Sequence, residues 1–530
     1  NNATSDGIFV FTSSAPPASV ALGNNVCVTG TISEFIPPSD PNSPAQTEFT
    51  SVTVTLLSTG NALPAPIVLT TADTDPAGSF YQLEKYEGMR VQVPTLLVVG
   101  PTGGSVNEAN ATATTDGYFY GVVSGVARPF REPGVQQPDP LPPGAPGTVT
   151  RFDANPEMLG INSTGLTGST AINVAAGATI ANLTGPLDFR FRLYTIDIDA
   201  GSAPVVSNNN LTYTAVPVPT ANEVTVASFN TERFFDTVND PGVSDAVLTL
   251  TAFNNRLNKL SLAIRNVLNT PDILGLEEVE NLSTLQAIAN KVNADAVAAS
   301  QPNPNYVPYL VEGNDVGGID VAFLVKSSRV NVIDVTQYGL STTYIDPSTG
   351  TPALLNDRPP LVLNATVSRT GCTTPFPLTV IVNHLRSLNG VDDPVDGTRV
   401  RAKRNAQGEY LATLIQGFQT ANPAANIVSV GDYNAFEFSD GYADVMGAIK
   451  GTPVPASEVV LASSTITNPP LSDLVQSHTP AQRYSYNFGG NAQVLDHILV
   501  NNNAQAKLSR FSIARLDADF PEIIRNDANR

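Results

Sequence analysis

The run at 427–435 constrains the fold more than any other part of this chain. It reads Ile-Val-Ser-Val-Gly-Asp-Tyr-Asn-Ala, so a β-branched stretch stops at a glycine and then supplies a carboxylate and a carboxamide. Such a stretch is typical of a strand buried within a sheet. Residues two apart share a face of a strand, so Asp432 and Asn434 are expected to point the same way and could hold a metal ion and a phosphate oxygen together. The sequence Gly-Asp-x-Asn fits an Asx turn equally well, and the run alone leaves that alternative open.

Strands and helices alternate on both sides of this run, from Val224 onward. The stretch at 256–268, for example, places its apolar residues along one helical face. The predicted strands cover 224–230, 273–276, 321–325, 361–367, 378–382, 427–430 and 493–500, and the predicted helices cover 256–268, 283–292 and 401–418. Because several strands end in a polar residue, the pattern predicts an α/β sandwich with a site at one edge of its sheets.

The first part of the chain has a different pattern. From residue 7 to residue 130, short alternating runs are broken by Gly, Pro and Asn, and a strand-like run resumes at 189–194. This spacing indicates a small barrel or sandwich, so the whole chain is of the α+β class. A length of 530 residues is too great for one core. We therefore expect an all-β domain at 1–215 with a proline-rich excursion at 129–148, a linker at 216–222 and a second domain at 223–530.

The charge of the chain limits how it can bind a polyanion. It has 48 acidic and 28 basic residues, a formal net charge of −20, and about half of that charge falls in residues 1–222. Neither half has the basic balance of a nucleic-acid binder. If the substrate is a polyanion, a bound cation must neutralise it locally.

Composition also bears on localisation. The chain opens with polar residues, as a mature product would, and has neither a charged-then-apolar leader nor an apolar run long enough to span a membrane. Few lysines, no tryptophan and only two cysteines resemble an exported bacterial protein, so we expect a secreted, extracellular or cell-surface location. Cys27 and Cys372 lie far apart in the sequence, and two buried or free thiols are favoured over a disulfide.

Polar residues at the predicted strand ends fall within five short motifs. These are Ser-Phe-Asn at 228–230, Leu-Glu-Glu-Val-Glu-Asn at 276–281, Val-Asn-His-Leu-Arg-Ser at 382–387, Gly-Asp-Tyr-Asn-Ala at 431–435 and Leu-Asp-His-Ile-Leu-Val at 495–500. In order and rough spacing they resemble the endonuclease/exonuclease/phosphatase superfamily, which includes pancreatic deoxyribonuclease. The resemblance covers residues 223–530 and implies a four-layer α/β sandwich.

The resemblance also implies roles for the residues at the strand ends. Glu278, with Asn230 nearby, would hold Mg²⁺ or Mn²⁺, with Ca²⁺ as a further possibility, because such ions take hard oxygen ligands. Glu277 stands where the family usually has glutamine and would add negative charge beside that ligand. His384 would donate to a phosphate oxygen or the leaving group, and Asp432 would orient or activate the attacking water.

Further residues would contact the phosphate. By the same resemblance, Asn434 would hydrogen-bond the scissile phosphate and Asp496 would support the network on that side. Arg358 resembles the family's phosphate-contacting arginine, whose planar fork suits a phosphodiester, and Arg386 is a weaker candidate. The basic residues between 399 and 404 are either a solvated helix start or a contact to backbone phosphate. His497 should face away from Asp496 and serve packing, and His478 has no assigned role.

The sequence departs from the family pattern at two places, and its amino-terminal part shows a further resemblance. The chain has Val321 where relatives often carry a tyrosine. The family's closing Ser-Asp-His-x-Pro is not present after 517–530, so the domain is expected to lack its last strand. Residues 7–215 resemble the amino-terminal β region of large secreted bacterial nucleases, which is related to the oligonucleotide-binding barrel and could bind substrate or a cell-surface partner.

Three functions fit these observations. The first is a secreted, divalent-metal-dependent phosphodiesterase, a nuclease acting on extracellular DNA or RNA by in-line attack of water. The second keeps the fold but hydrolyses a phosphomonoester, an inositol phosphate or a phospholipid head group. The third is a surface binding or structural module that lost catalysis with the terminal Asp–His pair. DNA versus RNA, endo versus exo cleavage, the metal and the oligomeric state are left open.

Overall fold

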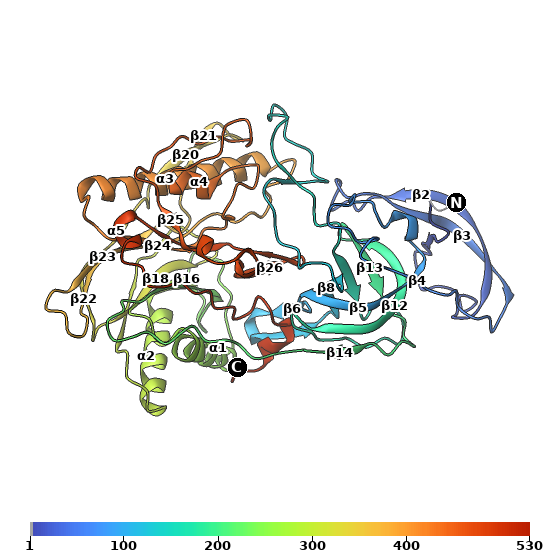
Figure 1. Cartoon of the computed structure of the whole chain (residues 1–530), viewed down its shortest axis with the longest axis horizontal. Helices are drawn as coiled ribbons and strands as arrows, with labels where there is room; N and C mark the ends of the chain where they lie inside the picture. Colours follow the sequence, from blue (N-terminus) through green and yellow to red (C-terminus); the bar gives the residue numbers. More distant parts are fainter. Residues whose placement is uncertain (1–3) are drawn as a thin grey trace.

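The structure is a computed structural model that describes residues 4–530. It has a mixed α/β fold with a β-rich amino-terminal part and a carboxyl-terminal part of sheets and helices, and the two lie at opposite ends of an elongated molecule (Figure 1). No helix among the described residues is both long enough and apolar enough to cross a membrane. Cys27 and Cys372 are both free and exposed, so no disulfide joins them.

The amino-terminal part contains a barrel. Seven strands follow the order β14-β12-β13-β11-β8-β5-β4, and the long β12 also pairs with β5, which closes the sheet on itself. Its interior is a continuous apolar core that includes Phe119, Ile180 and Leu183. The strands are β4 (Ile67–Val68), β5 (Arg90–Gly100), β8 (Tyr118–Val123), β11 (Leu159–Asn162), β12 (Thr179–Arg190), β13 (Leu193–Asp197) and β14 (Val205–Ser207).

Smaller sheets surround the barrel. A three-stranded arm projects from the amino-terminal end of the molecule (Figure 1). It is formed by β1 (Phe9–Val10), β2 (Asn25–Phe35) and β3 (Gln46–Ser58). Two short pairs are β6 (Gly104–Asn107) with β7 (Thr112–Thr115), and β9 (Val135–Gln136) with β10 (Arg151–Phe152); single 3₁₀ turns occur at Glu84–Tyr86 and Glu108–Asn110.

The strand expected at 189–194 is wrong, because a turn interrupts it. Arg190 of β12 pairs with Leu193 of β13, so the connection has only two residues. Phe191 and Arg192 both have positive φ, +52° and +59°. Positive φ at both central residues is what a tight hairpin turn requires, but such turns usually carry Asn or Gly, and neither is present here.

Two sheets form the carboxyl-terminal part. The four-stranded sheet has the order β15-β16-β18-β17, and the six-stranded sheet has the order β19-β22-β23-β24-β28-β25. Their strands are β15 (Val226–Phe234), β16 (Ile273–Val279), β17 (Tyr306–Leu310), β18 (Asp320–Lys326), β19 (Val330–Gln337), β22 (Leu361–Val367), β23 (Phe376–His384), β24 (Ile427–Asp432), β25 (Ser472–Asp473) and β28 (Asp496–Val500). Hairpins are made by β20 (Thr343–Asp346) with β21 (Thr351–Leu354), and by β26 (Tyr486–Phe488) with β27 (Asn491–Gln493).

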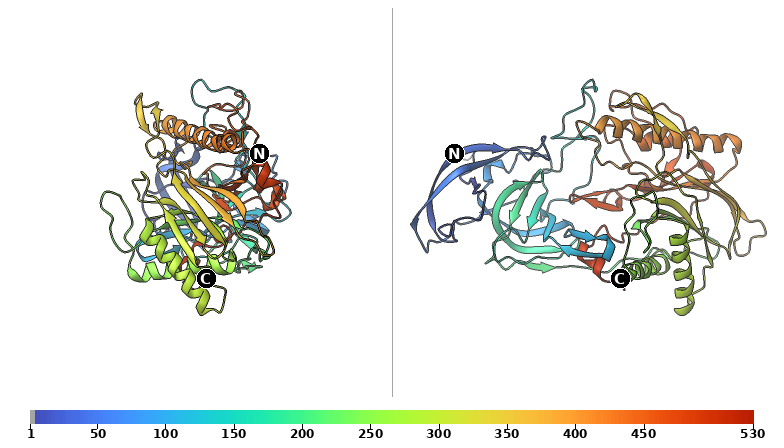
Figure 2. Two further views of the ribbon diagram at one scale, coloured as in Figure 1. Left: turned by 90° about the vertical axis from the view of Figure 1, so that its left-hand side faces the viewer. Right: turned by 180° about the vertical axis from the view of Figure 1, so that it is seen from behind.

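Helices cover the outer faces of these sheets (Figure 2). The helices are α1 (Leu250–Leu262), which continues as a π-helical turn at Ala263–Val267, α2 (Leu282–Ala298), α3 (Gly397–Ala421), α4 (Val445–Lys450) and α5 (Asn502–Gln505), with 3₁₀ turns at Leu474–Ser477, Pro480–Gln482 and Glu522–Asn526. One apolar cluster joins α1 and α2 to the four-stranded sheet, and another joins α3 and α4 to the six-stranded sheet. A third cluster, which includes Phe323, Val382 and Val430, fills the space between the sheets.

Two segments far apart in the sequence connect the two parts. The proline-rich segment crosses from the barrel to the region after β24, where Val135 and Val149 pack against Tyr442. The segment after α5 returns to the barrel, and the Glu522 backbone N–H donates to the Thr102 carbonyl at 3.0 Å. The strand ends that carry the candidate site therefore face a cavity bordered by both parts.

Candidate active site

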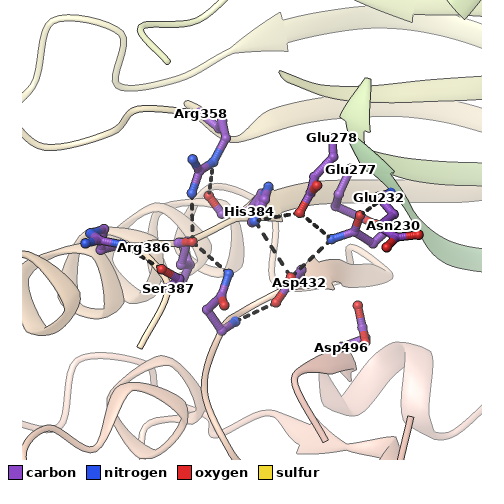
Figure 3. Close-up of polar contacts among 12 residues, drawn as sticks. Asn230, Glu232, Glu277, Glu278, Arg358, His384, Arg386, Ser387, Asp432 and Asp496 are labelled. Carbon is purple, nitrogen blue, oxygen red and sulfur yellow. Dashed lines mark hydrogen bonds and ion pairs between the residues drawn. The ribbon is translucent and has the colours of Figure 1, made fainter. Parts of the chain in front are cut away.

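Four strand ends and one position within β15 bring polar side chains to one edge of the two sheets (Figure 3). Glu278, His384 and Asp432 each present a ligand atom, and these atoms lie within 4.8 Å of one another. His384 Nε2 is 3.8 Å from Glu278 Oε1 and 3.7 Å from Asp432 Oδ2. Glu278 and Asp432 lie more than a hundred positions apart in the sequence, so the packing of the sheets is what brings the three residues together.

Strand register places three of the predicted residues in neighbouring positions. His384 ends β23, Asp432 ends β24 in parallel beside it, and Asp496 begins β28 opposite Asp432. Gly431 makes this approach possible, because a Cβ there would lie 1.9 Å from the Asn383 carbonyl oxygen and its φ is +142°. The glycine that closes the β-branched run is therefore required by the packing of β24 against β23.

Asn434 reaches the site through a turn. β24 ends at Asp432, and Asn434 has a left-handed φ of +47°. Its backbone N–H donates to Asp432 Oδ1 at 2.8 Å, which is an Asx turn, and its side-chain amide donates to the Leu385 carbonyl at 3.1 Å. The expectation that Asp432 and Asn434 share one face of an extended strand is therefore wrong, and the alternative of a turn is what forms.

Asn230 links the two carboxylates of the cluster. Its side-chain Nδ2 donates to Glu278 Oε1 at 3.0 Å and to Asp432 Oδ2 at 3.2 Å. Glu278 itself has a positive φ of +62° at the end of β16, where the pairing with both neighbouring strands shifts register. A non-glycine residue in this conformation is unfavourable, and such residues are held in place at functional sites by their surroundings.

Burial sets the protonation tendencies of the cluster. Burial raises the pKa of Glu278. Burial, and then the nearby charge of Asp496, raises the pKa of Asp432. Burial, and then the positive charge of Arg358, lowers the pKa of His384 well below its ordinary value. Burial thus disfavours the charged form of both carboxyl groups, and a divalent cation bound between them would favour it.

The structure separates the two predicted phosphate-contacting arginines. Arg358 lies beside His384, pairs with Asp315 at 2.5 Å and donates to the Leu385 carbonyl at 3.0 Å. Arg386 points away from the cluster (Figure 3), with its guanidinium bonded to Ser387 Oγ at 2.6 Å and to the Asn389 carbonyl at 3.1 Å. Of the two, only Arg358 is positioned next to the candidate catalytic group.

Two members of the basic cluster at the start of α3 are neither solvated nor free to bind phosphate. Lys403 and Arg404 are buried, and Lys403 pairs with Asp357 at 2.7 Å. Arg404 pairs with Asp440 at 2.7 Å and donates to the Asn434 carbonyl at 2.7 Å. Both alternatives drawn from the sequence are wrong for these two side chains, since their acidic partners are distant in the sequence. Arg404 instead fixes the loop that carries Asn434.

Several residues around the site were not anticipated. Ser485 Oγ donates to Asp496 Oδ2 at 2.9 Å. His497 is buried, as a packing residue should be, but it also pairs through Nδ1 with Asp473 at 3.0 Å. Glu277 is fully buried and accepts a hydrogen bond from Ser228 at 2.9 Å, and burial raises its pKa well above the ordinary value. A polar residue next to a predicted strand end was the only available signal for these contacts.

The cluster opens into a large cavity between the two parts of the molecule. This cavity has a volume of about 1770 Å³, and its lining includes Glu278, Asp432 and Asp496 from the sheets. Barrel residues such as Tyr120 and Phe191 line the same cavity. A polymer bound at the cluster would therefore meet the amino-terminal part as well.

Comparisons with known proteins agree with this description. A sequence profile described as endonuclease/exonuclease/phosphatase family matches residues 225–514, and a profile of a domain of unknown function matches residues 71–208. A search of curated proteins found no match.

A search of solved structures also returned matches. An endonuclease/exonuclease/phosphatase family protein from Bacteroides thetaiotaomicron is 16% identical, with coverage of 53% of this chain and 83% of its own and a TM-score of 0.32. TDP2 from D. rerio, complexed with single strand DNA product, is 16% identical over 52% of this chain and 83% of its own, with a TM-score of 0.29. A mannosyl-6-phosphatase from Bacteroides thetaiotaomicron is 14% identical over 53% of this chain and 86% of its own, with a TM-score of 0.31.

Proposed function

Because the chain belongs to the endonuclease/exonuclease/phosphatase family, we propose that it is a secreted, divalent-metal-dependent phosphodiesterase that hydrolyses nucleic acid. The observation that carries this proposal is the convergence of Glu278, His384 and Asp432 at one edge of the sheets. We also propose that the two-sheet part is a four-layer α/β sandwich and that the barrel is an oligonucleotide-binding fold. The few lysines and cysteines support export from the cell.

The donor set fits a hard divalent cation. Glu278 and Asp432 would hold Mg²⁺ or Mn²⁺ through carboxylate oxygens, and Asn230 already orients both carboxylates. Bound there, the cation would neutralise charge that develops on the phosphate. The raised pKa values of Glu278 and Asp432 support this proposal, because both carboxyl groups need a nearby positive charge to stay ionised.

The remaining residues would position the phosphodiester and the water. Asp432 accepts hydrogen bonds and would orient the attacking water, whose oxygen forms the new bond to phosphorus as the bond to the leaving oxygen breaks. His384, held neutral by burial, has one ring N–H that can donate to a phosphate oxygen. Arg358 beside it supplies positive charge without changing protonation. Catalysis of this kind rests on positioning and on electrostatic stabilisation.

A cleavage assay on plasmid and on single-stranded DNA tests the proposal. The protein should cleave with Mg²⁺ or Mn²⁺ and stop when a chelator is added. Asp432→Asn should lower kcat/KM by about 10²- to 10⁴-fold, the range for a lost acid–base group. Asp396→Asn changes an exposed carboxylate that does not line the cavity, and it is the matched control. Full activity of Asp432→Asn would refute this site, and release of phosphate from monoesters with intact plasmid would favour a phosphatase.

A further inference from the structure

The hairpin of β26 and β27 carries two aromatic rings beside the candidate site. Tyr486 and Phe488 lie on one face of β26, with nearly parallel rings at an interplanar angle of 25° and centroids 6.4 Å apart. Both line the cavity that contains Asp432 and Asp496. Phe488 is 65% exposed and Tyr486 is 37% exposed. The preceding residue, Ser485, is hydrogen-bonded to Asp496, so the rings begin directly next to the cluster.

The barrel holds this hairpin in place. The Asn487 side chain donates to the Val99 carbonyl of β5 at 2.9 Å. Gly490 packs so closely that a Cβ there would lie 2.7 Å from Cβ of Tyr120 in β8. Figure 1 shows β26 extending from the carboxyl-terminal part toward β8. The amino-terminal part therefore sets where the two rings stand relative to the site.

Aromatic residues continue from this contact across the barrel. Tyr120 lies edge-to-face with Tyr118 at 5.3 Å, and Tyr118 lies edge-to-face with Phe191 at 6.0 Å. Phe191 is 82% exposed and occupies a left-handed conformation in the β12–β13 turn, where it gains little from burial. Phe191 therefore presents an exposed ring to the same cavity that Tyr486 and Phe488 line, which extends the series of aromatic residues on that surface. We call Tyr486, Phe488, Tyr120, Tyr118 and Phe191 the aromatic track.

We propose that the aromatic track binds a single strand of nucleic acid and leads it from the metal-binding cluster onto the barrel. This rests on the proposed function and adds to it the form of the substrate. Bases of a single strand present π faces that stack on aromatic side chains whatever the sequence, whereas a duplex hides them. The track starts beside Asp496, in the cavity that also contains Asp432 and Asn434, so bases on one side of the scissile phosphate would stack on Tyr486 and Phe488.

Binding along the track depends on stacking more than on charge. Arg192, the residue after Phe191, is engaged by the protein itself: it pairs with Asp40 at 2.6 Å and with Asp139 at 2.8 Å. Arg192 therefore adds no unpaired positive charge beside Phe191. The logarithm of the affinity should accordingly fall only weakly with the logarithm of salt concentration, unlike that of proteins with many phosphate contacts.

A tryptophan reporter tests stacking separately from cleavage. The natural chain has no tryptophan, so Phe488→Trp introduces a single indole into the track. With metal omitted, an oligothymidylate of about 12 nucleotides, within the reach of one oligonucleotide-binding fold, should quench its emission to saturation. Tyr81→Trp is the matched control, because Tyr81 is 56% exposed on the amino-terminal part and does not line the cavity. Its emission should not change.

Affinity measurements with the same oligonucleotide give the second readout. Phe488→Ala and Phe191→Ala should each weaken binding about tenfold, while Phe488→Tyr should restore it because the ring is kept. Unchanged affinity of Phe488→Ala would overturn the proposal. So would equal quenching by a duplex, or quenching by a neutral oligosaccharide in place of the oligonucleotide. Binding without any cleavage would refute the proposed function and leave the track intact, so the two failures are distinguishable.

Discussion

At the scale of single residues, the most consequential side chains are cations that the fold has buried. Arg404 pairs with Asp440 and holds the carbonyl of Asn434, so it anchors the loop that completes the site. Both members of the pair are buried, which makes each dependent on the other. Removing one partner of a buried pair leaves the other charge uncompensated.

Arg404→Met is therefore expected to lower the free energy of unfolding by about 3–5 kcal/mol. Denaturation in urea, followed by circular dichroism, measures this. Arg399→Met is the matched control in the same helix, because Arg399 is partly exposed and pairs with an exposed Asp396; its change should be about 1 kcal/mol or less. Equal stabilities of the two variants would contradict the anchoring role of Arg404.

A buried carboxyl in the amino-terminal part makes stability depend on pH. Burial, and then the charges of Glu84 and Asp188, raises the pKa of Glu87 to about 8 from an ordinary 4.5. The folded state thus binds this proton more tightly than the unfolded state, so its contribution is complete below pH 4.5 and is lost as pH rises through 8. The free energy of unfolding should fall over this interval by a smaller amount in Glu87→Gln than in the natural protein. Glu458→Gln, at an exposed position, should follow the natural curve.

Whether the sequence alone could predict the role of a residue depends on what surrounds that residue. Glu278, His384 and Asp432 could be placed at strand ends because each follows an apolar run, and their roles followed from the resemblance of the surrounding motifs to a family; the structure brings all three together. The partners of Lys403 and Arg404 could not be predicted, because a run of basic residues reads the same in the sequence whether it contacts solvent or distant carboxylates. The packing of α3 against the segment before β22, which carries Asp357, and against the loop after β24, which carries Asp440, decides this.

At the scale of elements, β24 carries Asp432 between β23 and β28, and Gly431 is the position in β24 that has no room for a side chain. A Cβ at Gly431 would overlap the Asn383 carbonyl, so Gly431→Ala must separate β23 from β24 or unfold both. We expect destabilisation above about 4 kcal/mol, or no soluble protein. Gly417→Ala in α3 is the control: nothing lies within 4 Å of its added Cβ, and it should stabilise by about 0.5–1 kcal/mol. Thermal unfolding of both variants measures the difference.

Long apolar or amphipathic elements were predictable and short ones were not. The helix expected at 401–418 is α3, and the strands expected at 321–325 and 361–367 are β18 and β22. The helix expected from residue 256 begins at Leu250, where Thr249 accepts a hydrogen bond from the Ala252 N–H and caps it. The turn at Phe191 was missed because its local sequence favours a strand, and the pairing of β12 with β13 overrides that preference.

At the scale of the whole molecule, the two parts share an interface that includes the last described residues. Asn526 bonds Ala113 twice: it accepts from the backbone N–H and donates to the carbonyl, both at 2.7 Å. Ala176 and Thr102 of the amino-terminal part bond the backbone of the same segment. The domain boundaries expected at 215 and 223 remain a prediction, and these contacts indicate that the parts unfold together.

Calorimetry of the whole chain should therefore show one cooperative transition. Asn526→Ala removes two hydrogen bonds between the parts and should lower the free energy of unfolding by about 1–3 kcal/mol. The same variant should begin to separate the transition into two, since fewer contacts couple the parts. Two well-resolved transitions in the natural protein would contradict this coupling.

The return of the carboxyl-terminal segment to the barrel also has a consequence for synthesis. Ala113 and Asn526 are 413 residues apart, so the β6–β7 hairpin leaves the ribosome long before its partner exists. At ordinary translation rates that delay is roughly 20–80 seconds. During this time the β6–β7 hairpin lacks its partner segment, and the cavity can close only when translation has passed residue 526. Nascent chains halted before that point should expose this hairpin to chaperones.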